Sequence, residues 1–221
     1  LLESGYQNLT ADTDFPMSQH QNAWGVNDDI TFDHLYQMLK DRRDSPWHTA
    51  FLTLSSHEPF EVPYHRLKEK QPNAFAFTDH CLGEFVERIR KTPVWNNLLI
   101  VCLPDHGFYY PAEGNGHDAR IHHIPMLWLG GAVKQPMVIN QVMNQSDLAA
   151  TLLAQLGIDH SEFNFSRNIL STAYTYPFAY WTFGGGFAFA DSTGVTLVDI
   201  NADRPMLEIP SPDENRILRG K

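Results

Sequence analysis

Residues 98–107, LLIVCLPDHG, are the stretch that decides the fold class of this 221-residue chain. The six apolar residues at 98–103 are typical of a strand covered on both faces, as in a parallel sheet. Pro104 ends the apolar run, and the polar Asp105 and His106 follow directly. Because ligands of open α/β sheets bind at the carboxyl ends of the strands, we expect a functional site here.

Helices and strands alternate on both sides of this strand. Apolar spacing and capping residues predict three helices, at 29–44, 74–91 and 146–155. Runs of β-branched and apolar residues predict two more buried strands, at 48–54 and 124–129. This alternation is typical of an α/β fold in which a layered sheet has helices on both faces.

The last third of the chain has a different pattern. Between residues 178 and 209, short aromatic and β-branched runs are broken by glycine-containing turns at 184–186 and 192–194. This pattern predicts a C-terminal antiparallel β meander. We therefore divide the chain into residues 1–175, the main part of a catalytic-type domain, and residues 176–221, an antiparallel extension of the same domain.

Composition excludes some classes of function. The net charge of −10 argues against a nucleic-acid partner, which would need a basic surface. Cys81 and Cys102 lie in apolar runs and are expected to be buried free thiols. No stretch approaches the ~18 apolar residues of a membrane span, and no signal peptide or initiator Met opens the chain. The chain begins as if cut from a longer protein.

The pair Asp105 and His106 is the main candidate for metal binding. A hard carboxylate beside an imidazole suits Zn or Mn better than Ca. Gly107 would let the backbone turn sharply, so that the two side chains converge on one divalent metal ion. The alternative is an ordinary turn at a strand end, in which Asp105 caps the backbone and His106 is solvated.

Three further histidines are candidates for substrate binding. His57 follows the expected strand 48–54, where it could hold a phosphoryl or sulfuryl oxygen or act as a catalytic general acid. His117 and His123 lie in the polar loop before the strand at 124–129. The alternatives are that His57 only satisfies loop carbonyls and that the loop is solvated surface.

Several motifs in the same order resemble one family. They are WGVNDD (24–29), SSHEPF (55–60), FTDHCLGEF (77–85), PDHG (104–107), HHIPMLWLGG (122–131) and QSDLAATLLAQLGI (145–158). Together they resemble the alkaline phosphatase superfamily, in the branch that holds lipoteichoic acid synthases, phosphoethanolamine transferases and their sulfatase relatives. The resemblance extends from about Gly5 to Leu170 and implies a large mixed sheet between helices, incomplete here.

The resemblance also implies a mechanism. A metal-activated nucleophile attacks phosphorus or sulfur, and water or an alcohol resolves the covalent intermediate. Asp105 and His106 match two of the metal ligands, whereas the nucleophile and an acidic ligand belong to segments before Leu1. His57 matches a substrate-contacting histidine, and His117 approximates a second one. Cys102 is not the nucleophile, because His106 stands where the sulfatase Cys-x-Pro-x-Arg signature requires Arg.

The function expected from this resemblance is that of a metal-dependent phosphoglycerol or phosphoethanolamine transferase, or of a sulfuric or phosphoric ester hydrolase. The substrate would be a phosphate or sulfate ester, lipid- or glycan-linked. The parent protein would be membrane-anchored, with this domain outside the cytoplasm. Alone, the chain is expected to be inactive and to associate with its missing N-terminal half or with itself.

A second hypothesis is a non-catalytic domain that keeps the fold and binds a glycan or a partner protein. The aromatic residues Tyr109, Tyr110 and Trp181 and those of the meander could line such a surface. The alternative, which aromatic composition alone favours, is that the same residues pack the core and the sheet edges. Retention of both Asp105 and His106 favours the enzyme.

Overall fold

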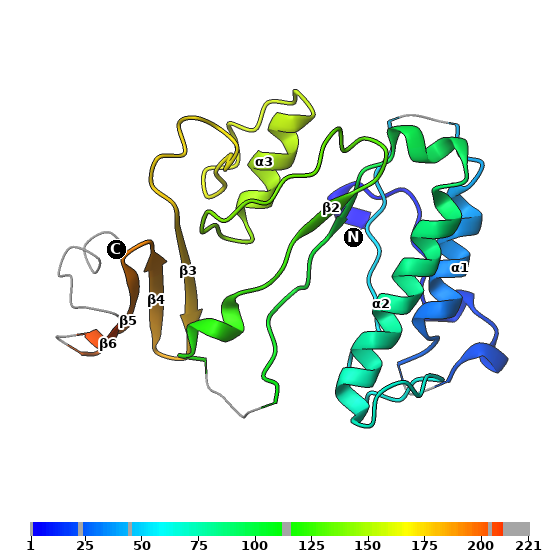
Figure 1. Ribbon diagram of the computed structural model, residues 1–221, viewed down its shortest axis with the longest axis horizontal. Helices are drawn as coiled ribbons and strands as arrows, with labels where there is room; N and C mark the ends of the chain where they lie inside the picture. The colour runs from blue at the N-terminus through cyan, green and yellow to red at the C-terminus, as the bar shows by residue number, and fades with distance from the viewer. Residues whose placement is uncertain (1, 22–23, 44–45, 112–115, 203–204, 210–221) are drawn as a thin grey trace. The chain divides into compact units, whose positions relative to one another are not determined.

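The computed structural model of the chain describes residues 2–21, 24–43, 46–111, 116–202 and 205–209 (Figure 1). These residues form two compact units. Unit 1 comprises Leu1–Val101 and Trp128–Gln135, and unit 2 comprises Cys102–Leu127 and Pro136–Lys221. The boundaries of these units differ from the predicted ranges 1–175 and 176–221. Those ranges were two parts of a single domain, and this division stays a prediction.

Two packed helices form the core of unit 1. They are α1 (Asp28–Leu39) and α2 (Lys70–Ile89), and both predicted helices are thus confirmed. The buried side chains recur at helical spacing and form one cluster: Phe32, Leu35, Leu39, Phe77, Cys81, Phe85, Ile89 and Leu98. The first helix ends before the predicted Asp44, because the charged residues after Leu39 offer no apolar side chain to the core.

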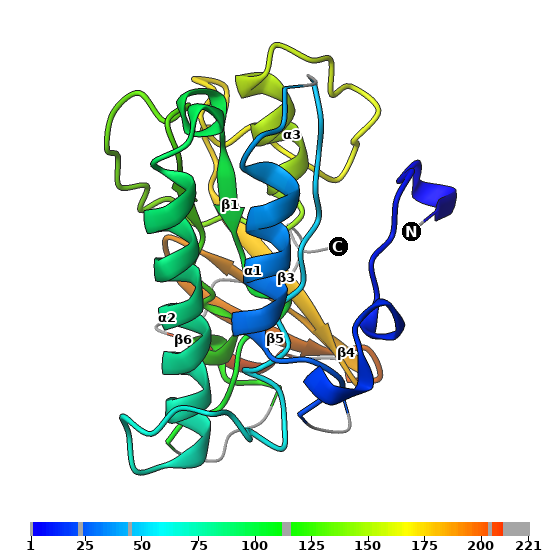
Figure 2. The ribbon, with the colours of Figure 1, turned by 90° about the vertical axis from the view of Figure 1, so that its right-hand side faces the viewer.

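The predicted strand at 48–54 is wrong. The segment is extended and lies beside α1, where the ring of Phe51 contacts that of Phe32, but it forms no strand (Figure 2). Leu52 is 78% exposed. A strand is defined by pairing, and among the residues that the structure describes no strand runs beside this segment.

The strand predicted at 98–103 is shorter than expected and does not lie in a parallel sheet. Strand β1 (Ile100–Cys102) pairs with β2 (Leu127–Leu129) in a two-stranded sheet. The residues after β2 return beside those before β1, since Gly131 N donates to Trp95 O over 3.1 Å and Ala132 N to Leu98 O over 3.2 Å. This reversal is antiparallel, and the β1 side chains are only half buried.

Unit 2 contains α3 (Asp147–Gln155) and the predicted meander, and both are confirmed. The meander strands pair in sequence order, each antiparallel to the next: β3 (Phe178–Phe183), β4 (Gly186–Asp191), β5 (Gly194–Asp199) and β6 (Pro205–Ile209). The β3–β4 and β4–β5 turns fall at the two glycine-containing breaks seen in the sequence. The mixed α/β class with an antiparallel C-terminal sheet is therefore correct.

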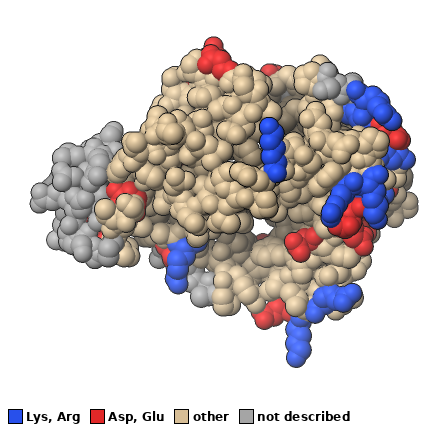
Figure 3. Space-filling view, turned by 45° about the horizontal axis from the view of Figure 1, so that its top comes forward, with Lys and Arg blue, Asp and Glu red and all other residues tan. Residues whose placement is uncertain are grey.

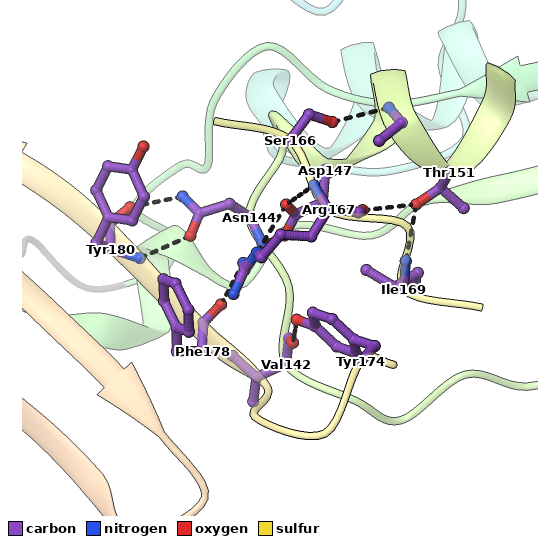
Figure 4. Close-up of polar contacts among 11 residues, drawn as sticks. Val142, Asn144, Asp147, Thr151, Ser166, Arg167, Ile169, Tyr174, Phe178 and Tyr180 are labelled. Carbon is purple, nitrogen blue, oxygen red and sulfur yellow. Dashed lines mark hydrogen bonds and ion pairs between the residues drawn. The ribbon is translucent and has the colours of Figure 1, made fainter. Parts of the chain in front are cut away.

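A buried ion pair fastens α3 to the start of the meander (Figure 4). Asp147 is fully buried and accepts hydrogen bonds from the Arg167 backbone N and side chain. The same guanidinium donates to Phe178 O over 2.8 Å, and its carbon lies 3.7 Å from the centre of the Phe178 ring. Because a buried carboxylate is stable only when it is paired, this contact fixes the chain between α3 and β3.

Charged side chains on the face shown in Figure 3 are mixed, with Lys and Arg mostly beside Asp or Glu. Among the described residues, no helix combines the length and the apolar character that crossing a bilayer requires.

Candidate functional site

Asp105 and His106 occupy an exposed turn directly after β1. Their side chains are 90% and 71% exposed, and His106 Nε2 lies 3.7 Å from Asp105 Oδ2. Asp105 Oδ1 also accepts a hydrogen bond from His106 N over 3.0 Å. The two side chains thus point to the same side of the turn rather than diverging.

The geometry of this pair fits a shared divalent ion. Zinc lies about 2.0–2.2 Å from a ligating His nitrogen or carboxylate oxygen, so one ion can reach two atoms as far apart as 3.7 Å. His106 Nδ1 lies 2.8 Å from Gly107 O, a contact that fixes the ring and leaves Nε2 to face an ion. Within the described ranges, no group of three or more His, Cys, Asp or Glu is placed so that it could hold a metal ion.

Position 107 requires glycine because the structure leaves no space for a Cβ there, and not because of a positive φ. A Cβ on Gly107 would lie 1.4 Å from Ile121 O, and Gly107 is not among the glycines with positive φ. The expectation that Gly107 lets the backbone turn sharply stays a prediction, and the structure gives lack of space as the reason for glycine at this position. The close approach places the Asp105 turn against the short 3₁₀ helix η5 (Ala119–His122).

Gln145, which sequence reasoning missed, holds the other flank of the turn. Its side-chain amide donates to Pro104 O over 2.7 Å and to Asp105 O over 3.2 Å. It lies two residues before α3, where nothing in the local sequence pattern distinguishes it from a solvated polar residue.

The loop histidines lie against the meander. The ring of His117 meets Phe183 edge-on, with centroids 4.5 Å apart, and His122 stacks on Trp181, also at 4.5 Å. His123, a predicted substrate contact, ends η5 with its side chain exposed. His122 was not predicted as a site residue, although it has a stacking contact with Trp181 and lies within hydrogen-bond distance of Gly116 O.

An ion pair of Asp118 and Arg120 lies beside His117. The guanidinium donates to both carboxylate oxygens, and these hydrogen bonds lower the pKa of Asp118 to about 2. The pair borders a hollow of about 640 Å³, whose other wall is formed by apolar side chains of β5 and β6. Residues 112–115 of this loop lie outside the described residues.

His57 lies in unit 1, on an exposed turn after the extended segment. Its Nδ1 lies 2.9 Å from Glu58 O, and its ring packs on Trp24 with centroids 4.6 Å apart. Phe60 N donates to His57 O over 3.0 Å and closes the turn, with Phe60 at a φ of 60°. Strained backbone of this kind persists where the surroundings fix it, and functional sites are enriched in it.

Asp28 fixes the chain that leads to His57. Its fully buried carboxylate accepts hydrogen bonds from Leu54 N, Ser55 N and Thr78 Oγ1, at 2.8, 3.3 and 2.7 Å. Ser55 Oγ in turn accepts from Asp28 N. Asp28 is the first Asp of the WGVNDD motif, and it was assigned no role of its own from the sequence. The predicted role of His57 as a substrate contact stays a prediction.

Both cysteines are free thiols, as predicted, but only Cys81 is buried, while Cys102 is half-buried. Burial raises the pKa of Cys102, which opposes formation of the reactive thiolate and agrees with its exclusion as a nucleophile. Most of the aromatic side chains that could have formed a binding surface pack within unit 2. Phe189 is buried and stacks on Phe178, while Tyr180 stays 43% exposed.

The fold is similar to that of solved structures of one superfamily. The structure is similar to that of an alkaline phosphatase superfamily protein from Vibrio parahaemolyticus, with a TM-score of 0.73 and 19% identity, over 91% of this chain and 54% of that one. It is also similar to the lipoteichoic acid synthase LtaP from Listeria monocytogenes, with a TM-score of 0.66 and 15% identity, over 86% of this chain and 55% of that one. The fold is that of the alkaline phosphatase superfamily.

Within this class, the Sulfatase family model matches residues 3–158, and the chain belongs to the Sulfatase family. It is 25% identical to phosphoglycerol transferase I of Xanthomonas campestris over 165 residues, 69% of this chain and 24% of that protein. It is 22% identical to the lipoteichoic acid synthase-like protein YvgJ of Bacillus subtilis over 238 aligned positions, 90% of this chain and 38% of that protein. The resemblance predicted from the motifs is confirmed. The chain spans well under half of the length of these relatives.

Proposed function

We propose that the chain forms part of a metal-dependent site that transfers phosphoglycerol or phosphoethanolamine groups. The observation that carries the proposal is the exposed pair Asp105 and His106, whose ligating atoms lie 3.7 Å apart with the other ring nitrogen engaged by Gly107 O. Relatives named phosphoglycerol transferase and lipoteichoic acid synthase support phosphoryl transfer rather than sulfate ester hydrolysis. Hydrolysis would use the same site with water as the acceptor.

In this proposal, one set of residues binds the metal ion and another set contacts the substrate. Asp105 and His106 would hold Zn or Mn, which supplies a Lewis acid for a phosphoryl oxygen. His57 is oriented by the contact of its Nδ1 with Glu58 O, and its Nε2 would hold an oxygen or pass a proton to a leaving group. His117 and His123 would contact the substrate from the loop before β2.

The remaining parts of the site would come from another segment of a longer protein. We propose that this segment precedes residue 1 and supplies the nucleophile and an acidic ligand, as the coverage of 24% to 38% of the curated relatives supports. The names of the relatives also support a lipid- or glycan-linked substrate in the cell envelope, handled by a membrane-anchored parent with this domain outside the cytoplasm. The isolated chain would then be inactive and prone to self-association.

The test is an assay with Zn or Mn against aryl phosphate, phosphodiester and sulfate ester substrates. We expect no turnover by the chain alone, and phosphodiester turnover when the preceding segment is present. Asp105→Asn should abolish this turnover, whereas Asp159→Asn, at an exposed carboxylate outside the site, should not. His57→Ala should lower turnover and leave the metal content intact.

Two results would contradict the proposal. Robust turnover by the chain alone, abolished by Asp105→Asn, would show that the chain contains its own nucleophile. A preference for sulfate esters over phosphodiesters would replace phosphoryl transfer by sulfatase activity at the same metal pair.

A further inference from the structure

Two aromatic side chains on one face of β3 hold the histidine loop. Trp181 and Phe183 are two residues apart in a strand, so their side chains project from the same face. Trp181 stacks on His122 with an interplanar angle of 23°, and Phe183 meets His117 at 66°. Each of these pairs thus joins one loop residue to one ring of the meander.

Hydrogen bonds strengthen this attachment. Trp181 Nε1 donates to Gly116 O over 3.2 Å, and His122 Nε2 lies 3.2 Å from the same oxygen. The loop at 116–122 is therefore fastened to β3 near both of its ends. Between these ends, Ile121 O lies against Gly107, in the space that a Cβ would need.

The neighbouring residue of β3 is connected to the opposite flank of the same turn. Tyr180 N donates to Asn144 Oδ1 and Asn144 Nδ2 donates to Tyr180 O, both over 2.8 Å (Figure 4). The next residue, Gln145, donates to the carbonyls of Pro104 and Asp105. Strand β3 is thus joined to both flanks of the Asp105 turn, through contacts that all lie within unit 2.

We propose that Trp181 and Phe183 are positioning residues, which hold the loop 116–123 against the Asp105–His106 turn through His122 and His117. Both lie outside residues 3–158, the range that the Sulfatase family model matches. The inference about structure stands on these contacts alone, while its effect on catalysis rests on the proposed function. The stack of Trp181 on His122 and the two contacts with Gly116 O share their partners, so loss of Trp181 should loosen the whole loop.

Hydrogen exchange of the loop amides tests the positioning role without any need for activity. Trp181→Leu removes the stack and the hydrogen bond to Gly116 O, and exchange at 116–123 should accelerate roughly tenfold. Trp181→Phe keeps a ring on His122 and should give a smaller acceleration, and Phe183→Leu should act mainly near His117. Tyr180→Leu is the matched control, because it removes an aromatic ring from the opposite face of β3.

A spectroscopic signature separates positioning from general destabilisation. The imidazole protons of His122 lie over the Trp181 ring, so their resonances should move downfield in Trp181→Leu and not in the control. Unchanged exchange and unchanged His122 resonances in Trp181→Leu would overturn the positioning role. If that variant does not fold, the same comparison with Trp181→Phe and Phe183→Leu decides.

The catalytic consequence is measured in the longer protein that carries the complete site. Trp181→Leu should lower kcat/KM about tenfold at unchanged metal content, with partial rescue in Trp181→Phe. A looser loop with unaltered kcat/KM would overturn the catalytic consequence. If the unaltered protein transfers no phosphoryl group, the proposed function fails, while the exchange and resonance results still decide the positioning role.

Discussion

Replacing Asp28 tests how the structure fixes the chain that carries His57. The carboxylate is fully buried and accepts hydrogen bonds from Leu54 N, Ser55 N and Thr78 Oγ1. Asp28→Ala leaves these three donors without an acceptor. Because a buried donor left unpaired costs about 1–3 kcal/mol, we expect a loss of ~3–5 kcal/mol in the free energy of unfolding.

The isosteric replacement should cost much less. In Asp28→Asn, the amide oxygen can still accept from Leu54 N and Ser55 N, and the Thr78 hydroxyl can turn to accept from the amide NH₂. We expect a loss of about 1–2 kcal/mol. Asp29→Ala is the matched control, since its side chain is exposed on the same helical turn and should change stability by less than about 0.5 kcal/mol.

Denaturant titration followed by tryptophan fluorescence measures these differences. Four of the five tryptophans, Trp24, Trp47, Trp95 and Trp128, belong to unit 1 and report on the part of the chain that holds Asp28. The order of stability should be wild type, then Asp28→Asn, then Asp28→Ala. Equal stability of Asp28→Ala and Asp29→Ala would refute the reasoning, because it would mean that the three donors find other partners.

Three further predictions follow from other contacts. Gly107→Ala should destabilise unit 2 by at least about 1–3 kcal/mol in denaturant titration, because the added Cβ would overlap the carbonyl oxygen of Ile121. The control is Gly83→Ala in α2, where a Cβ meets no other atom and the substitution should be neutral or stabilising. Burial, and to a smaller extent nearby carboxylates, raise the pKa of Cys81 to about 12, so its thiol should resist alkylation at pH 8. The stability that the neutral thiol contributes should be fully present below about pH 9 and lost as the pH rises toward 12. Hydrogen bonds from Arg120 lower the pKa of Asp118 to about 2, so an NMR titration of its carboxyl carbon should have a midpoint near pH 2, and Arg120→Ala should raise that midpoint. The stability that this pair contributes is present above the ordinary Asp pKa of 3.8 and is lost as the pH falls through 2.

Elements whose signal is local could be predicted from the sequence. The two long helices follow from apolar side chains at helical spacing, and the meander follows from glycine-containing turns between short β-rich runs. The segment 48–54 shows the limit of such patterns, because a β-rich run becomes a strand only when a neighbour pairs with it. Likewise, the run at 98–103 looked like the centre of a parallel sheet, but its only partner is the antiparallel β2 among the strands that the structure describes.

Candidate site residues could be chosen from the sequence by residue type, but residues that act through distant partners could not. Asp105 and His106 could be chosen because adjacent metal-binding side chains follow an apolar run. Asp28 and Gln145 could not, since their partners lie 26 to 50 and 40 to 41 residues away in the chain. The contact of Trp181 with His122 could not be predicted either, because this stack joins residues on either side of α3.

Zinc titration of the chain, followed by residue-resolved NMR, tests the central claim that Asp105 and His106 share one ion. We expect a single weak site whose binding perturbs the resonances of these two residues first. Asp105→Asn and His106→Gln should each weaken binding at least about tenfold, while His65→Gln, at an exposed histidine outside the site, should leave it unchanged. Zinc affinity that is unaffected by both substitutions in the turn would contradict the account.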